Sequence, residues 1–257
     1  MSSPRVPEPL ASVALFREDP YMQDAPAQVL RITEEGGVVL DRTIFYPSGG
    51  GQPGDSGRIE WTSTTSGNGT SGRVSIATAV KGEGGEIVLV PAEPVSLPPE
   101  GTRLTQHLDW QRRHRHMRVH TALHLLSVVI PLPVSGGAIG AEKGRLDFDM
   151  PDAQIDRDGI EAALNALIEC DLKVSDSWIS DDELRADPSI VKTMSVMPPL
   201  GQGRVRLVRI GAGETQVDLQ PCGGTHVART AEIGRVTLGK IEKKGRQNRR
   251  FTIHLDL

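Results

Sequence analysis

The sequence has little cysteine, few aromatic residues and no long apolar run. Its two cysteines, Cys170 and Cys222, are too few for a disulfide framework in 257 residues, and a reducing compartment suits a thiolate that binds metal. Aromatic residues make up 4% of the chain, which disfavours a broad base-stacking surface. No run of about 18 apolar residues is present, and the N-terminus lacks a basic segment followed by an apolar core. These absences predict a cytoplasmic protein with no membrane partner.

Phosphate-binding glycine motifs are also missing in their functional form. Gly49, Gly51 and Gly54 satisfy the pattern Gly-x-Gly-x-x-Gly, but Pro53 and a following strand leave no helix N-terminus to hold a pyrophosphate. Taken alone, this segment is read as a tight turn that needs positive φ, with a flexible loop over a substrate as the alternative.

The first third of the chain reads as β structure. Two β-rich runs, residues 27–32 and 38–45, flank a glycine turn and predict a hairpin. Further short strands are expected at residues 57–61, 72–80 and 86–90, which together indicate a small barrel or sandwich. The Pro-rich segment 91–101 is the expected boundary. We therefore expect a β-barrel domain over residues 1–95 and an α+β domain over residues 104–257.

A long helix is the main element expected in the second domain. It covers residues 108–130, with Asp109 as N-cap and Pro131 as the stop. Cys170 is expected to be a buried apolar residue. The other expected elements are a glycine turn at 135–140, a strand at 145–150, helices at 156–172 and 181–186, a loop at 194–203, and strands at 205–210 and 215–219.

The expected helix carries a His-x-x-x-His pair, His120 and His124. Residues four apart share a helix face, so both imidazoles can reach one ion. His116 with His120 has the same spacing, but the basic run 112–118 around His116 looks solvated and disfavours a cation there. Because no Glu lies between the two histidines, the zinc-peptidase pattern His-Glu-x-x-His does not apply.

A second half-site, Cys222-x-x-x-His226, lies far along the chain. A thiolate and a third imidazole complete four ligands of the types that zinc prefers. Between them, Gly223 and Gly224 let the backbone turn closely and offer amide N–H groups as donors. The alternative is an ordinary turn with a free cysteine.

A concentrated basic segment ends the chain. Six basic residues fall between positions 240 and 250 against one acidic residue, in a chain of formal net charge −4. Such a run is either a solvated surface or a contact for the phosphates of a nucleic acid. The candidate RNA contacts are Arg118, Lys243, Lys244, Arg246, Arg249 and Arg250.

Taken in order, these motifs resemble the AlaX family of free-standing alanyl-tRNA editing proteins, which is related to the editing domain of alanyl-tRNA synthetase. The resemblance covers roughly residues 14–257. The segments that carry it are Leu40–Pro53, Arg118–Leu126, Arg145–Phe148, Gln220–His226, Glu242–Gly245 and Asn248–Arg250.

The resemblance implies a fold, a cofactor and an activity. The fold is an N-terminal glycine-rich β-barrel followed by an α+β editing domain of the synthetase second-additional-domain type. The cofactor is Zn²⁺, held by His120, His124, Cys222 and His226. The activity is hydrolysis of the ester on tRNA(Ala) mischarged with serine, and also with glycine. An alanine pocket cannot strongly exclude these residues, so a second hydrolytic site is needed.

The resemblance also implies where the substrate binds. Gly50, Gly51 and Gln52 would line or cover the editing pocket, and the amides of Gly223 and Gly224 would stabilise the oxyanion. Thr121 is the candidate partner of the serine hydroxyl, with packing or a back-bond within the helix as the alternative.

Two questions stay open at this point. The metal either orients the terminal ribose or amino group of the substrate, or loses one weak ligand to a water molecule. The sequence names no general base and indicates no oligomeric state. The main rival function is a non-catalytic zinc-stabilised RNA-binding module; a tRNA-charging synthetase and a small-ester metallohydrolase are weaker rivals.

Overall fold

The computed structural model describes residues 11–63, 70–150, 155–186 and 203–256. The chain divides into two compact units, Met1–Gly49 with Pro53–Arg113, and Gly50–Gln52 with His114–Leu257. The long helix α1 (Trp110–Val129) contributes its first turn to the first unit and the rest to the second. No helix in the described part of the chain is long and apolar enough to cross a bilayer.

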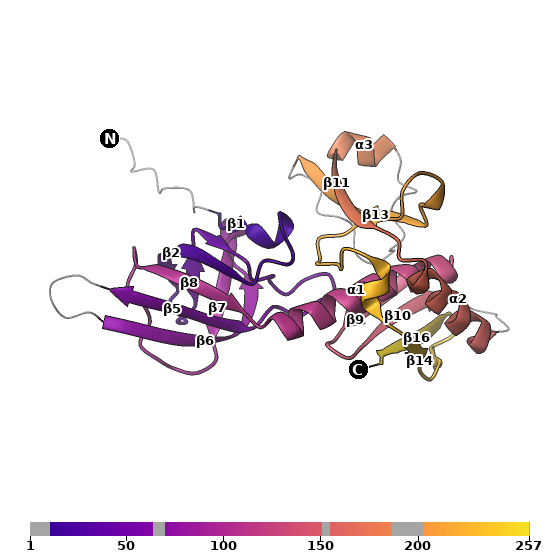
Figure 1. The fold of residues 1–257 in the computed structure, drawn as a ribbon, viewed down its shortest axis with the longest axis horizontal. Helices are drawn as coiled ribbons and strands as arrows, with labels where there is room; N and C mark the ends of the chain where they lie inside the picture. Colours follow the sequence, from indigo (N-terminus) through magenta and orange to yellow (C-terminus); the bar gives the residue numbers. More distant parts are fainter. Residues whose placement is uncertain (1–10, 64–69, 151–154, 187–202, 257) are drawn as a thin grey trace. The chain divides into compact units, whose positions relative to one another are not determined.

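The first unit is a closed barrel of six antiparallel strands in the order β2-β3-β7-β6-β5-β8 (Figure 1). Alternating residues point inward, so that Ile59 and Val74, opposite each other on neighbouring strands, are both buried. A short parallel pair, β1 (Val13–Ala14) and β4 (Arg42–Thr43), accompanies the barrel. The barrel strands are β2 (Asp24–Ile32), β3 (Val38–Leu40), β5 (Gly57–Ser63), β6 (Thr70–Lys81), β7 (Ile87–Pro91) and β8 (Arg103–Leu108).

The barrel is larger than the sequence suggested. The hairpin β2-β3 is present as predicted, with Gly36 at φ +82° in its turn. Strand β8 was not predicted, and nearly all of it falls in the range expected for the second domain; it pairs with both β2 and β5 and closes the barrel. The Pro-rich segment is therefore a connection within the barrel, and the chain passes from the first compact unit to the second after Arg113 instead of near residue 95.

A buried ion pair anchors the base of the glycine-rich loop within the first unit. The Arg113 guanidinium binds the Asp55 carboxylate and donates to the carbonyl of Ile44 at 2.6 Å. The same carboxylate accepts the Tyr46 N–H at 2.6 Å. Because Arg113 is 1% exposed, the expectation that residues 112–118 form a solvated basic run is wrong: charge complementarity with Asp55 takes this arginine inside.

The second unit contains two antiparallel sheets. One has the order β14-β16-β10-β9, with β15 paired to β16, and the other has the order β11-β12-β13. Two further helices are α2 (Arg157–Glu169) and α3 (Asp181–Ala186). The strands are β9 (Val134–Ile139), β10 (Lys143–Asp149), β11 (Val174–Ser180), β12 (Arg204–Ile210), β13 (Asp218–Pro221), β14 (Val236–Leu238), β15 (Glu242–Lys244) and β16 (Asn248–Leu255).

Helix α1 packs on the larger sheet through a glycine. A Cβ at Gly144 in β10 would lie 2.5 Å from Cγ1 of Val119 and 3.0 Å from Cδ1 of Leu123. The absence of a side chain there allows the helix to approach the strand closely. The predicted cap of this helix is confirmed, since the Asp109 carboxylate accepts the Arg112 N–H at 3.2 Å.

Three other expectations about the second domain need correction. The glycine turn expected at 135–140 is strand β9, because pairing with β10 overrides the low strand propensity of its glycines. Cys170 is exposed at the end of α2 instead of buried. The strand expected at 215–219 begins later, at Asp218. The loop expected at 194–203 lies outside the described residues, apart from Gly203.

Candidate metal centre

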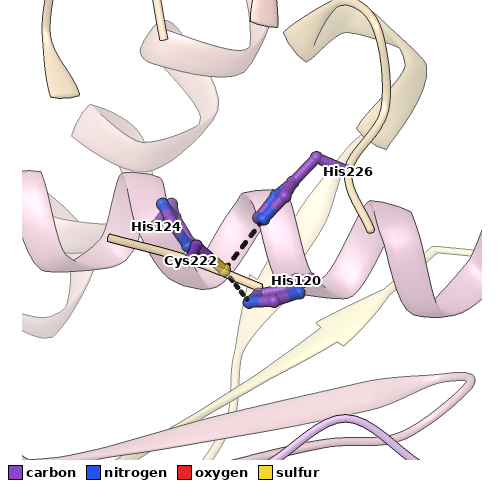
Figure 2. A group of neighbouring side chains, drawn as sticks. All are labelled: His120, His124, Cys222 and His226. Atoms are coloured by element: carbon purple, nitrogen blue, oxygen red, sulfur yellow. Dashed lines mark hydrogen bonds between the residues drawn. The ribbon is translucent and has the colours of Figure 1, made fainter. Parts of the chain in front are cut away.

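Four side chains from two distant segments meet in the second unit. His120 and His124 project from α1, and Cys222 and His226 lie in the loop that follows β13 (Figure 2). One ligand atom from each residue lies within 4.8 Å of all the others. The Cys222 Sγ atom is 3.4 Å from Nε2 of His120 and 3.3 Å from Nε2 of His226. The structure thus assembles the four expected ligands, without His116, into a cluster that could hold a metal ion.

Each histidine of the cluster has a hydrogen-bond partner on its other ring nitrogen. These contacts fix the orientation of the rings and leave all three Nε2 atoms turned toward the centre, an arrangement typical of metal-binding histidines. The Nδ1 partners are Oε1 of Gln52 for His120 at 3.1 Å, Oδ2 of Asp218 for His124 at 3.0 Å, and Oγ1 of Thr121 for His226 at 3.2 Å.

Gln52 brings the glycine-rich segment into the centre. Its Oε1 accepts the Thr225 N–H at 3.1 Å in addition to contacting His120, and its Nε2 donates to Thr225 Oγ1 at 2.9 Å. The neighbouring Gly51 carbonyl accepts the N–H of Ile139 at 2.9 Å, which ties the segment to strand β9. Gln52 is buried, so both polar ends of its side chain are satisfied within the protein.

Asp218 and Gln220 support His124 from strand β13. The Gln220 Nε2 atom donates to Asp218 Oδ2 at 2.8 Å and lies 3.0 Å from Nδ1 of His124. Ser127, one turn further along α1, donates to the His124 carbonyl at 2.7 Å. Asp218 is 2% exposed, and a buried carboxylate hydrogen-bonded to an imidazole makes the imidazole a more basic ligand.

The electrostatics of the cluster favour a thiolate. Burial opposes ionisation of Cys222, but the charge of His120 and hydrogen bonds with His120 and His124 outweigh it and hold the pKa of the thiol well below its ordinary value. Burial lowers the pKa of His226 well below its ordinary value, and the charge of His120 lowers it further. A thiolate and a neutral imidazole are the forms that bind metal.

The pKa of His124 is shifted in the opposite direction to that of His226. Burial acts to lower its pKa, but hydrogen bonds to Asp218 and Cys222 raise the pKa to about 9. Because the neutral imidazole is the form that binds metal, a proton and a metal ion compete for His124.

Arg206 holds the loop that carries Cys222. Its Nη1 donates to the carbonyls of Cys222 at 3.1 Å and Gly224 at 2.9 Å, and its Nε contacts Asp176 at 3.3 Å. The Arg206 side chain is 9% exposed. On the side of the ligands, the Gly224 N–H lies 3.5 Å from Cys222 Sγ, and the Thr225 N–H donates to Oε1 of Gln52.

The two loop glycines have different surroundings. A Cβ at Gly224 would lie 2.3 Å from the His120 ring and 2.8 Å from Gln52 Oε1, so no side chain fits there. Gly223 is exposed, and no atom lies within 4 Å of the position of its Cβ. Among the described residues its N–H has no hydrogen-bond partner. The exposed edge of the cluster is therefore at Gly223 and the partly exposed Cys222, because the three histidines are buried.

Thr121 does not have the environment expected of a substrate contact. Its hydroxyl donates to the Met117 carbonyl at 2.9 Å, accepts the Val227 N–H at 3.3 Å, and contacts Nδ1 of His226. The side chain is fully buried. This is the back-bond alternative, with the added role of orienting a ligand.

The candidate RNA contacts fall into two groups. Arg118 donates to the Ile233 carbonyl at 2.8 Å, and Arg250 binds both carboxylate oxygens of Asp147 at 2.7 and 2.8 Å, so both have structural partners. The others lie on or beside the β15-β16 turn: Lys243, Lys244 and Arg246 are exposed and Arg249 is half-buried.

Asp218, Gln220 and Arg206 were not singled out from the sequence. Asp218 and Gln220 stand four and two residues before Cys222, and this period of two predicts side chains on one face of a strand. The alternation was available in the sequence, whereas the Arg206 contact depends on how β12 and β13 pair.

One stretch of sequence defines the class of this domain; it contains the loop with Cys222 and His226 and the basic hairpin β15-β16. Residues 205–252 match the family described as the threonyl and alanyl tRNA synthetase second additional domain. This match agrees with the fold type that the motifs implied.

Similar proteins extend the match to nearly the whole chain. The alanyl-tRNA editing protein AlaX-M of Methanosarcina barkeri is 34% identical over 93% of this chain and 96% of its own length. The AlaX-L protein of Pyrococcus horikoshii is 30% identical over 90% of this chain and 55% of its own. The alanine–tRNA ligase of Pyrobaculum arsenaticum is 34% identical, and this chain spans about a quarter (25%) of the ligase. The chain belongs to the AlaX family of alanyl-tRNA editing proteins, as its motifs suggested.

Proposed function

We propose that the protein is a trans-editing aminoacyl-tRNA deacylase that hydrolyses the ester of mischarged tRNA(Ala), chiefly Ser-tRNA(Ala), with Gly-tRNA(Ala) as a second substrate. The observation that carries this proposal is the cluster of His120, His124, Cys222 and His226, open to solvent at one edge, in a chain of the AlaX family. Action on tRNA also fits the cytoplasmic location expected from the sequence.

The metal in this proposal is Zn²⁺. Imidazole nitrogens and a thiolate are its usual protein ligands, with bonds of about 2.0–2.1 Å to nitrogen and about 2.3 Å to sulfur. Tetrahedral neighbours at those bond lengths are about 3.5 Å apart, close to the 3.3 and 3.4 Å between Cys222 Sγ and two Nε2 atoms. Zn²⁺ would supply a positive charge that orients and polarises the polar groups of the substrate.

The residues around the cluster provide positioning and one hydrogen-bond donor. The ester approaches at the exposed edge, where the Gly223 N–H donates to its carbonyl oxygen as charge develops there. Gln52, Asp218 and Thr121 keep the three imidazoles fixed during the reaction. Gly224 has no side chain, which leaves room for the His120 ring and for Oε1 of Gln52 beside it.

The tRNA backbone is proposed to contact the basic hairpin. Lys243, Lys244 and Arg246 are exposed there and supply local positive charge in a chain of net charge −4. Their contribution is sequence-independent and positions the acceptor end.

The test is a deacylation panel with Ser-, Gly- and Ala-tRNA(Ala), with and without a chelator. We expect hydrolysis of the first two esters, sparing of Ala-tRNA(Ala), and loss of activity in His124→Ala and Cys222→Ala. Matched controls are His254→Ala and Cys170→Ala, which change an exposed histidine and an exposed cysteine outside the cluster.

Two results would contradict the proposal. The first is undiminished turnover in a folded Cys222→Ala variant. The second is tight tRNA binding by the zinc-loaded wild type without any hydrolysis, which would favour the RNA-binding module instead.

A further inference from the structure

An exposed tryptophan with a stacked arginine lies on strand β11. Trp178 is 39% exposed, and Cζ of Arg204 lies 4.8 Å from the centroid of its ring. Aromatic residues are scarce in this chain, and an exposed indole costs hydration free energy. Nucleobases stack on both aromatic rings and guanidinium planes. Trp178 and Arg204 therefore form a ledge, that is, a surface on which a base can stack.

The ledge is in register with the metal centre. Trp178 lies directly opposite Arg206 in the β11-β12 pairing. The β12-β13 ladder continues beyond Pro221, since the Cys222 N–H donates to the Arg206 carbonyl at 3.1 Å. Trp178, Arg206 and Cys222 thus form one row across three strands. Neighbouring strands lie about 4.8 Å apart, which puts the Trp178 backbone roughly 10 Å from that of Cys222.

The ledge also lies on the sheet face that supports the cluster. Alternation along β12 places Arg204 and Arg206 on the same face as Val208 and Ile210. Those two residues pair with Gln220 and Asp218, whose side chains contact His124. Trp178 is opposite Arg206 and shares this face.

The exposed edge of the cluster, at Cys222 and Gly223, indicates which part of the substrate the ledge binds. In an aminoacyl-tRNA the ester is on the ribose of the terminal nucleoside, so its base must lie within one nucleoside of the reacting carbonyl. If the ester lies at Cys222 and Gly223, the row of Cys222, Arg206 and Trp178 extends from the ester to the indole. We propose that Trp178 and Arg204 form a stacking subsite for the terminal nucleobase of the substrate. This subsite rests on the proposed function, because it takes the ester at the metal centre as its starting point.

Steady-state deacylation of Ser-tRNA(Ala) tests the subsite. Base stacking on an aromatic residue predicts that Trp178→Ala raises KM about tenfold, with kcat and zinc content unchanged. Trp178→Phe keeps a ring and should restore most of the KM, while Arg204→Ala should raise it severalfold. Arg209→Ala is the matched control, because Arg209 is on the same strand but on the opposite face.

Binding measurements keep the test decisive if a variant folds poorly or turnover is absent. We expect adenosine monophosphate to quench wild-type tryptophan fluorescence and to leave Trp178→Phe largely unquenched. Equal KM in Trp178→Ala and Arg209→Ala, or equal quenching in wild type and Trp178→Phe, would overturn the subsite. Absence of hydrolysis by the wild type would overturn the proposed function alone, since quenching and tRNA affinity still report on the ledge.

Discussion

Gln52 and His120 are hydrogen-bonded through Oε1 and Nδ1 at 3.1 Å, although 68 positions separate them in the sequence. The glycine-rich segment therefore contributes to the candidate centre, because its glutamine sets which nitrogen of His120 faces Cys222. Beside the substrate role predicted for it, Gln52 has a structural role that uses both ends of its amide.

Replacing Gln52 should weaken metal binding. Gln52→Leu removes the acceptor for Nδ1 of His120 at similar volume, and loss of such a partner lowers metal affinity by about 10- to 100-fold. Gln52→Glu retains an acceptor and should stay close to wild type. Chelator competition measures the affinity, with Gln216→Leu, an exposed glutamine, as control. Wild-type affinity in Gln52→Leu would show that His120 is fixed by other contacts.

Arg206 should stabilise the loop that carries Cys222. Arg206→Ala removes charged donors from two carbonyls, and we expect the free energy of unfolding to fall by about 2 kcal/mol. The lysine of Arg206→Lys has no planar guanidinium to donate to both carbonyls, so this variant should recover only part of the lost stability.

Two measurements check the Arg206 prediction. Denaturant unfolding gives the loss of stability, and the thiolate-to-metal absorption of the cobalt-loaded protein reports the position of Cys222. Arg209→Ala should change stability by no more than about 0.5 kcal/mol. An unchanged cobalt spectrum in Arg206→Ala would mean that the loop holds its shape without the guanidinium.

The ion pair between Asp147 and Arg250 should make stability depend on acid pH. The hydrogen bond from Arg250, and the charge of Arg145, hold the pKa of Asp147 below its ordinary value. Its contribution is therefore fully present above the unfolded pKa of about 3.9 and is lost as pH falls through the lower folded value. Because both partners are partly exposed, we expect no more than about 1 kcal/mol.

Urea unfolding of Asp147→Asn at pH 7 and at pH 3 measures this contribution. The variant should be less stable than wild type at pH 7, and the difference should shrink at pH 3. Asp158→Asn, on an exposed helix position, serves as the control. A difference that is the same at both pH values would exclude Asp147 ionisation as its source.

The exposed lysines of the β15-β16 hairpin should contact tRNA without supporting the fold. Lys243→Gln should weaken tRNA binding and reduce the slope of log affinity against log salt by about one unit. Arg250→Gln should mainly reduce stability, since its guanidinium is already paired with Asp147. A Lys243→Gln protein with an unchanged salt slope would remove this residue from the interface.

Local spacing accounts for the parts of the site that the sequence predicted. His120 and His124 are four apart on one helix, and Cys222 and His226 are four apart in one loop, so each half-site is visible in a short window. The partners of these ligands are not, because Gln52 and Asp218 lie 68 and 94 positions from the histidines they contact.

The difference between short-range patterns and long-range contacts also explains which parts of the fold could be predicted. The hairpin β2-β3 has a glycine turn and a regular strand pattern, and it was predicted. Strand β8 was missed because Gln106 interrupts its apolar inward positions. The structure buries this glutamine and pairs it with Thr43 Oγ1 at 2.7 Å. Arg113 was misjudged for a related reason, since its partner Asp55 is 58 positions away.

The separation between the two half-sites determines when the centre forms during folding. Cys222 meets His120 across 102 positions, and we expect contacts of such long range to form late in folding. In that case a metal ion would link segments that are still apart in the folding transition state. A bound metal should therefore slow unfolding far more than it speeds folding, and so give the protein kinetic stability.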